Sequence, residues 1–175
     1  MVFETERLYL REMNQGDLEA LSRILRDEET MYAYNGAFSA EETQEWLDRQ
    51  IGRYRRYGFG LWAVILKETG EMIGQCGITM QPWNDREVLE VGYLLRKDCW
   101  HKGYAIEAAK ACKEYAFTNL HADEVCSIIR DTNTASQKVA VRNGMIVTDK
   151  WTKHYRGIDM PHYLYSVRRH GSDKG

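Results

Sequence analysis

The sequence predicts a single domain of the mixed α/β class, with one sheet of about seven strands and helices on both faces of that sheet. Three observations support this class. The chain has 175 residues, which is enough for one domain with a substantial core. Runs of alternating or continuous apolar residues, typical of strands, are interleaved with runs in which apolar residues recur at helical spacing. Their expected order is strand, two helices, three strands, helix, strand, helix and two strands.

The N-terminal third is expected to contain the first strand and two helices. The first strand is predicted at 7–13, where RLYLREM alternates apolar and polar residues. Apolar residues at helical spacing after Asp17 predict the first helix. Ser39 and Glu42 have the spacing of a capping box, which predicts the start of the second helix.

The remaining elements follow from apolar runs and from turns that contain glycine. The loop QPWNDRE, at 81–87, is expected to separate two strands. The last helix is expected to end at Gly144, which suits the left-handed residue that closes many helices. The expected elements are strands at 59–67, 72–80 and 88–95, a helix from about 103 to 117, a strand at 124–129, a helix at 133–144, and a hairpin of 145–155 and 160–167.

Composition and charge favour an ordinary globular protein. Hydrophobic residues make up 43% of the chain and charged residues 29%, and the net charge is −2. This balance gives no reason to expect binding to nucleic acid or to an anionic membrane. No apolar stretch of signal-peptide length occurs in the opening MVFETERLYLREM, and no uncharged run reaches the length of a membrane span. The expected location is therefore the cytoplasm.

The cysteines and histidines do not form a metal-binding pattern. The five histidines are scattered, and the four cysteines include no CxxC pair. We therefore predict no metal site and no disulfide framework, and we expect the cysteines to be small buried side chains. They are Cys76, Cys99, Cys112 and Cys126.

The segment WHKGYA, at 100–105, has the features of a helix start that binds phosphate. A strand is expected to end near Arg96, and a helix to begin around Lys102 or Gly103. The first N–H groups of a helix have no partner within it, and the macrodipole makes this end positive. Gly103 lacks the Cβ that would obstruct an anion, so the site suits a polyphosphate. An ordinary amphipathic helix with one glycine at its start explains the same residues equally well.

Two common nucleotide motifs are missing from this region. The chain contains no GxxxxGK[ST] sequence, which excludes a P-loop. The GxGxxG motif of a dinucleotide fold is also missing. The small side chains along the same helix would let it lie close to its sheet. They are Ala105, Ala108, Ala109, Cys112 and Ala116.

Three segments together resemble the GNAT superfamily of N-acetyltransferases, particularly its ribosomal-protein-acetylating, RimJ/RimL-type branch. The family's first strand is similar to TERLYLRE, at 5–12. Its pyrophosphate motif is similar to EVGYLLRKDCWHKGYAIEA, at 90–108, and its second cofactor motif to DTNTASQKVAVRNGM, at 131–145. The resemblance implies the acyl-CoA N-acyltransferase fold, with a mostly antiparallel sheet, over residues 1–170. Residues 171–175 would form a C-terminal tail.

The resemblance also implies acetyl-CoA as the acyl donor, with no metal. Its pantetheine arm would pair with the backbone around Leu94, Leu95 and Arg96. The diphosphate would lie on the N–H groups around Lys102, Gly103, Tyr104 and Ala105. Members of the family usually have glycine where His101 stands, and we expect the His101 side chain to point to solvent.

The second cofactor motif implies further contacts. Asn133 would hold the pantetheine arm near the thioester, and Ser136 would lie close to the sulfur. Lys138 and Arg142 are candidates for the outer phosphates of the coenzyme.

The implied reaction is direct attack of a primary amine on the thioester. Such an amine is mostly protonated at neutral pH, so a nearby group must accept a proton before the attack. Glu90 is the first candidate because a carboxylate among apolar neighbours gains basicity, although a structural hydrogen bond explains it equally well. Ser136 is a candidate donor of a proton to the sulfur, and His154 or His162 could relay protons. A backbone N–H near Leu94 or Leu95 is expected to stabilise the oxyanion.

The acceptor is expected to contact the first two helices and the final hairpin. Candidate aromatic residues of this cleft are Tyr32, Tyr34, Trp83, Tyr155 and Tyr163. Each of them is also explained by ordinary packing. The acidic residues in 27–29 could attract a cationic amine, or could simply form a solvated helix end.

The sequence leaves the acceptor open. The main hypothesis is an acetyl-CoA-dependent N-acetyltransferase acting on a protein N-terminus or a small amine. The alternatives are a polyamine or aminoglycoside acetyltransferase on the same fold, and a non-catalytic sensor that binds acyl-CoA. No nucleic acid or membrane partner is expected. A monomer and a homodimer are both compatible with the sequence.

Overall fold

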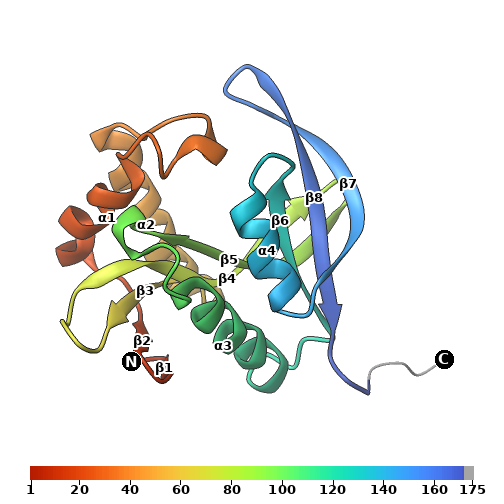
Figure 1. The fold of residues 1–175 in the computed structure, drawn as a ribbon, viewed down its shortest axis with the longest axis horizontal. Helices are drawn as coiled ribbons and strands as arrows, with labels where there is room; N and C mark the ends of the chain where they lie inside the picture. Colours follow the sequence, from red (N-terminus) through yellow and green to blue (C-terminus); the bar gives the residue numbers. More distant parts are fainter. Residues whose placement is uncertain (172–175) are drawn as a thin grey trace.

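The computed structural model describes residues 1–171, which form one sheet with helices on both faces (Figure 1). Beyond Gly171, the expected tail lies outside the described residues. The strands are β1 (Phe3–Glu4), β2 (Leu8–Arg11), β3 (Leu61–Leu66), β4 (Met72–Trp83), β5 (Arg86–Leu95), β6 (Glu124–Arg130), β7 (Ile146–Tyr155) and β8 (Ile158–Arg168). The α-helices are α1 (Leu18–Leu25), α2 (Ala40–Tyr57), α3 (Tyr104–Thr118) and α4 (Thr134–Arg142), and the short 3₁₀ helices are η1 (Gln15–Asp17), η2 (Tyr32–Tyr34) and η3 (Lys97–Cys99).

The eight strands are arranged in the order β1-β2-β3-β4-β5-β6-β8-β7. All neighbouring strands run antiparallel except β5 and β6, which are parallel. The prediction of a mixed, mostly antiparallel sheet is therefore confirmed. The additional strand is β1, which pairs with Tyr9 and Leu10 of β2. With two residues, it is too short to produce an alternating pattern in the sequence.

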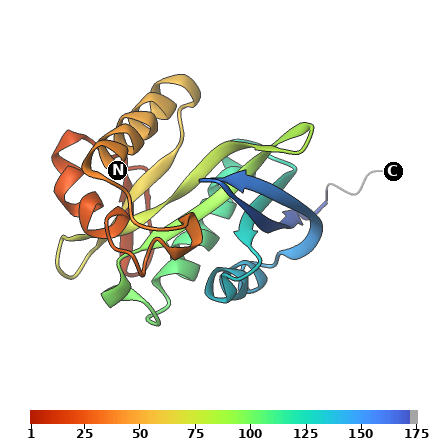
Figure 2. The same ribbon diagram turned by 90° about the horizontal axis from the view of Figure 1, so that it is seen from above.

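The helices divide between the two faces of the sheet. Figure 2 shows α1 and α2 on one side of the sheet and α3 and α4 on the other. The predicted capping box is confirmed: the backbone N–H of Ser39 donates to the Glu42 carboxylate at 2.8 Å, and the Glu42 N–H donates to Ser39 Oγ at 3.1 Å. This places the start of α2, and with it the side chains that α2 directs toward the sheet.

The prediction of a loop at 81–87 is wrong, because this segment forms a tight hairpin instead. β4 continues to Trp83 and β5 begins at Arg86, so the connection is only Asn84 and Asp85. Asn84 has a left-handed backbone with φ of 53°, as the favoured short hairpin turns require. The hairpin carries Trp83 into the interior, where its side chain is fully buried.

A small second core lies under the final hairpin. Trp83 packs edge-to-face against Trp151 at 5.5 Å, and its Nε1–H donates to Asp149 at 2.9 Å. The buried members of this core are Trp83, Val88, Cys126 and Leu164. The hairpin β7–β8 is thereby held to the end of the sheet, where it forms one wall of the site described below.

The four cysteines are buried and free, as expected from the sequence. Two of them, Cys76 on β4 and Cys112 on α3, bring their sulfurs to 3.5 Å. This contact is possible because the sheet-facing side of α3 carries small side chains, among them the fully buried Ala108 and Ala109. None of the helices in residues 1–171 combines the length and the apolar character needed to cross a bilayer.

Candidate active site

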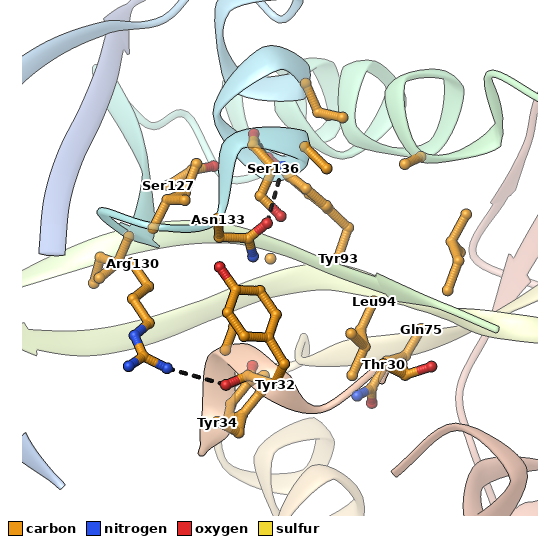
Figure 3. Close-up of a pocket in the computed structure, with 18 of the residues that line it drawn as sticks. Thr30, Tyr32, Tyr34, Gln75, Tyr93, Leu94, Ser127, Arg130, Asn133 and Ser136 are labelled. Atoms are coloured by element: carbon orange, nitrogen blue, oxygen red, sulfur yellow. Dashed lines mark hydrogen bonds between the residues drawn. The ribbon is translucent and has the colours of Figure 1, made fainter. Parts of the chain in front are cut away.

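A cavity of about 1300 Å³ opens where β5 and β6 separate (Figure 3). Among the described residues, these parallel strands pair at a single position, Glu90 with Cys126. Beyond that pair their C-terminal ends diverge. The cavity is lined by the ends of both strands, the starts of α3 and α4, the η2 turn, α2 and the hairpin β7–β8.

The separation of the strands leaves backbone groups of β5 facing the opening. The Arg96 N–H donates to the carbonyl of Ile73 at 2.8 Å and so points toward β4. Because backbone groups alternate direction along a strand, those of Leu94 also face β4, and those of Tyr93 and Leu95 face β6. The Leu95 carbonyl is taken by the indole N–H of Trp100 at 2.9 Å. The groups that remain for a ligand are the N–H and C=O of Tyr93 and the N–H of Leu95.

The start of α3 presents a run of unpaired amides to the same cavity. Within residues 1–171, the N–H groups of 101–106 donate to no protein acceptor, whereas that of Glu107 donates to the Gly103 carbonyl at 3.2 Å. Gly103 caps the helix with φ of +80°, and His101 is also left-handed with φ of +60°. His101 therefore keeps the backbone conformation that favours glycine. Its side chain is exposed, as expected, and lies at the edge of the cavity.

Arg7 and Glu107 attach this loop to the start of β2. The Arg7 backbone N–H and Nε donate to the two Glu107 oxygens at 2.8 and 2.7 Å, and Thr5 Oγ1 donates to the same carboxylate at 2.6 Å. Arg7 Nη1 donates to the Lys102 carbonyl at 2.8 Å, and its guanidinium lies over the Tyr104 ring at 4.5 Å. Sequence reasoning missed this role, because TERLYLRE was interpreted only as a strand.

The charge of Glu107 is favoured by the same contacts. Burial would raise the pKa of this carboxyl, but the hydrogen bonds from Thr5 and Arg7 outweigh burial and hold the pKa below its ordinary value. A carboxylate in the first turn also interacts favourably with the helix macrodipole. The loop is thus fixed in place before any ligand arrives.

The start of α4 forms the second border of the opening. Asn133 caps the helix, because its Oδ1 accepts the N–H of Ser136 at 3.2 Å, and Figure 3 shows its amide nitrogen directed into the cavity. Tyr93 ties α4 to β5 through a hydrogen bond from its hydroxyl to the Ser136 carbonyl at 2.7 Å. Lys138 and Arg142 are exposed along the same helix and line the cavity.

Glu90 lies on the opposite face of β5, where its carboxyl lines the cavity and is partly accessible from it. One oxygen accepts the N–H of Ile128 at 3.0 Å. Burial raises the pKa of Glu90 above its ordinary value. The Ile128 hydrogen bond and the positive charges of Lys153 and Arg53 oppose this shift without cancelling it. The carboxyl therefore has both the structural hydrogen bond and the raised basicity that the sequence left as alternatives.

The predicted acceptor aromatics are only partly brought together. Tyr32, Tyr34 and Tyr155 line the cavity, but Trp83 is buried in the second core and does not. Tyr163 does not line it either, and lies under the Lys150 ammonium at 5.1 Å. The hairpin at 84–85 explains the Trp83 error, because it turns this side chain away from the site.

The histidines and acids proposed for this side are distributed as follows. His162 lines the cavity, and burial lowers its pKa. His154 also lines the cavity, but it is exposed and bonded to Asp159 at 2.9 Å. In the acidic run, Asp27 and Glu29 both pair with Lys97 at 3.3 Å, so much of that charge is compensated.

Most of the cofactor residues expected from the sequence meet at the cavity. Those that line it are Leu94, Leu95, Gly103, Tyr104, Ala105, Asn133, Ser136, Lys138 and Arg142. Arg96 and Lys102 do not line it. The Arg96 guanidinium instead bonds to Asp98 at 2.6 Å, and the Lys102 side chain is exposed. Residues 1–171 contain no group of three or more His, Cys, Asp or Glu side chains placed to hold a metal ion.

Comparison with known proteins shows likeness to one family model, one relative and two solved structures. A family model described as an acetyltransferase (GNAT) domain matches residues 7–146. The uncharacterized protein YkkB of Bacillus subtilis is 36% identical over 153 residues, which cover 85% of this chain and 89% of that protein. An acetyltransferase structure from Agrobacterium tumefaciens has a TM-score of 0.80 and 28% identity, over 95% of this chain and 94% of that one. The structure of RimL, a ribosomal-protein acetyltransferase in complex with coenzyme A, has a TM-score of 0.77 at 19% identity, over 94% of this chain and 95% of that one.

Proposed function

The chain belongs to the GNAT acetyltransferase family, and we propose that it transfers the acetyl group of acetyl-CoA to a primary amine by direct attack on the thioester. The acceptor in this proposal is a protein N-terminus or a small amine. One observation carries it: unpaired amides that suit a diphosphate and a carboxyl of raised pKa open into the same cavity. We assign the activity to one domain, residues 1–170, and to the cytoplasm expected from the sequence.

Acetyl-CoA is proposed to enter between β5 and β6. The diphosphate would accept hydrogen bonds from the N–H groups of 102–106, where the macrodipole also favours an anion. The pantetheine amides would pair with the free backbone groups of Tyr93 and Leu95. Leu95 keeps the role expected from the sequence, and Tyr93 takes it in place of Leu94 and Arg96. Asn133 Nδ2 would donate to the same arm. Lys138 and Arg142 would meet the outer phosphates, and neither forms an ion pair within residues 1–171.

The proposed chemistry needs two proton transfers from the amine. One proton leaves the ammonium before attack, and a second leaves the nitrogen as the amide forms. The C–N bond forms at the acetyl carbon, the C–S bond breaks, and the sulfur leaves as a thiol after gaining a proton. The acetyl oxygen becomes negative in between, and the Leu95 N–H is the proposed donor that stabilises it.

Glu90 is the proposed acceptor of the first proton. A raised pKa brings a carboxylate closer to the working pH, where a general base is most effective. The nearby positive charges of Lys153 and Arg53 favour its ionised form and so oppose the effect of burial. Ser136 is proposed to return a proton to the leaving sulfur. Much of the rate would come from holding the amine and the thioester side by side.

Release of free CoA, measured on the purified protein with acetyl-CoA and a panel of amines, tests this proposal. The panel contains short peptides, amino acids, polyamines and aminoglycosides. We expect CoA release with at least one class, and the acetylated product to carry an amide. Tight binding of acetyl-CoA with no turnover on any amine would contradict the proposal and favour the acyl-CoA sensor.

A further inference from the structure

We infer that the acceptor carries an anionic group, a carboxylate or a phosphate, within a few bonds of the amine that is acetylated. This inference rests on the proposed function, because it assigns the second substrate of the same cavity. It is carried by three cationic side chains that enter the acceptor side of the cavity from three elements: Arg53 from α2, Arg130 from β6 and Lys153 from β7.

These three cations are half-buried, and none of them forms an ion pair within residues 1–171. Among the described residues, Arg53 donates to Gln50 Oε1 alone, at 3.1 Å. Arg130 donates to the Tyr32 carbonyl at 3.0 Å, as Figure 3 shows, while its buried Nε has no hydrogen-bond partner. Lys153 lies over the Trp151 ring at 5.9 Å. Within residues 1–171, none of the three forms an ion pair, and the Lys153 ammonium makes no hydrogen bond.

The other charges at the rim of the acceptor side are either paired or exposed to solvent. Arg156 pairs with Glu42 at 2.9 Å, and Glu45 and Arg49 are exposed one turn apart on α2. Glu29 pairs with Lys97 at 3.3 Å. The interior of this side is left with three cations and one carboxyl, Glu90.

The cations surround one common space rather than separate ones. Arg53 and Lys153 both act on Glu90, since each of their charges lowers the pKa of its carboxyl. Lys153 and Arg130 both act on His162, whose pKa their charges lower. The carboxyl that is proposed to take a proton from the amine is therefore flanked by unpaired positive charge.

This charge selects among acceptors. Half-buried cations without partners are costly, and an anion placed among them would offset that cost. A polyamine or an aminoglycoside would instead bring several positive charges into a site that is already positive, where like charges repel strongly. A zwitterion meets both requirements, with its amine toward Glu90 and its anion toward Arg53, Arg130 and Lys153.

Matched pairs of acceptors test the inference. One arm compares amino acids with their carboxamides, for example phenylalanine with phenylalaninamide, and another compares phosphoethanolamine with ethanolamine. Spermidine represents the polycations. The carboxamide has the less basic amine, so simple reactivity would favour it over the acid. We expect the reverse, with kcat/KM about 10- to 100-fold higher for the anionic member of at least one arm. The arm that shows the preference tells whether the anionic group of the acceptor is a carboxylate or a phosphate.

Two variants with matched controls test whether Lys153 and Arg53 cause the preference for anionic acceptors. Lys153→Met and Arg53→Gln should each reduce the ratio of anionic to neutral turnover by about tenfold. Lys150→Met on the same strand and Arg55→Gln on the same helix should leave the ratio unchanged, because neither side chain lines the cavity. If Lys153 or Arg53 had only a structural role, its replacement would lower kcat/KM equally for both acceptors of a pair. The ratio would then stay unchanged, and this result would overturn the inference.

Binding measured without turnover separates this inference from the proposed reaction. The same pairs are titrated by calorimetry into the protein saturated with CoA. Preferential binding of the anionic members with no acetylation would support the inference and contradict the reaction. Equal or better acetylation of the neutral member in both arms, or of spermidine, would support the reaction and overturn the inference.

Discussion

Arg7 and Glu107, 100 residues apart in the chain, are joined by two hydrogen bonds of 2.8 and 2.7 Å, through the Arg7 backbone N–H and its Nε. The same guanidinium bonds to the Lys102 carbonyl. The segment at the start of α3 is therefore attached to the start of β2. Its unpaired amides are held in position, so a bound anion would not have to pay for ordering them.

Replacing Arg7 should weaken donor binding without unfolding the protein. We expect Arg7→Met to lower acetyl-CoA affinity about 3- to 10-fold, a modest loss because the arginine is partly exposed and its ion pair partly screened. Calorimetric titration measures this change. Arg23→Met, which removes an exposed pair with Glu19, is the control and should bind normally. Equal affinity in the two variants would mean that Arg7 does not position the loop.

A substitution at Gly103 tests the proposed diphosphate site, which is formed by the unpaired amides at the start of α3. Gly103→Glu should reduce acetyl-CoA affinity by about tenfold or more, because it adds a negative charge beside the unpaired amides and a Cβ that would lie 3.2 Å from Arg7 Nη2. Gly157→Glu is the matched control. Gly157 is also left-handed, with φ of +77°, but it lies in the β7–β8 turn with nothing near its Cβ position. Similar losses of acetyl-CoA affinity in both variants would show that backbone strain causes the effect, and not the proposed diphosphate site.

His101 has a backbone conformation that can be tested through stability. A β-branched residue is strained at φ of +60°, so His101→Val should lower the free energy of unfolding by about 1–2 kcal/mol. His101→Gly should change it by less than about 1 kcal/mol, because relief of strain is offset by a more flexible unfolded chain. Urea denaturation of both variants gives these values. A valine variant as stable as the glycine variant would show that residue 101 is not left-handed in solution.

Glu90→Gln should lower turnover about 100-fold or more near neutral pH, where the amine is mostly protonated and needs a base. The deficit should shrink as pH rises, because a growing fraction of the amine is already neutral. Acetyl-CoA affinity should not change. The pH dependence of kcat/KM for both proteins is the measurement, and a variant with the wild-type rate and profile would remove Glu90 from the mechanism.

The same substitution should alter the pH dependence of stability in a defined direction. The pKa of Glu90 is higher in the folded protein than in the unfolded chain, so the folded state holds its proton over a range where the unfolded state has lost it. The free energy of unfolding therefore contains a term that falls as pH rises through that range. Glu90→Gln should lack this term, which urea denaturation at several pH values would reveal. A steeper fall in the variant would contradict the raised pKa.

Local patterns predicted most of the fold because each depends on neighbouring residues. The Ser39–Glu42 capping box places the start of α2, and the alternation in RLYLREM gives β2. The sequence predicts a loop at 81–87 where the structure has a two-residue turn. A left-handed asparagine between two strands, such as Asn84, and an asparagine in a longer loop look alike in sequence. Only the pairing of Trp83 with Arg86 across the turn distinguishes them.

The donor side of the site was more predictable than the acceptor side. Gly103 and Asn133 lie at helix starts, where one residue and its neighbours determine which amides are free. Arg53, Arg130 and Lys153 come from three distant elements, and only the assembled fold brings them into one cavity with Glu90. The register of β5 cannot be read from the sequence, so the backbone contacts expected at Leu94, Leu95 and Arg96 include two residues whose backbone faces β4, Leu94 and Arg96, and omit Tyr93.

A crystal structure of the protein with acetyl-CoA tests the central claim most directly. We predict diphosphate oxygens within hydrogen-bonding distance of the N–H groups of 102–106, with the thioester between β5 and β6 on the Glu90 side. A diphosphate bound elsewhere, or an opening between these strands filled by the protein's own side chains, would contradict the account.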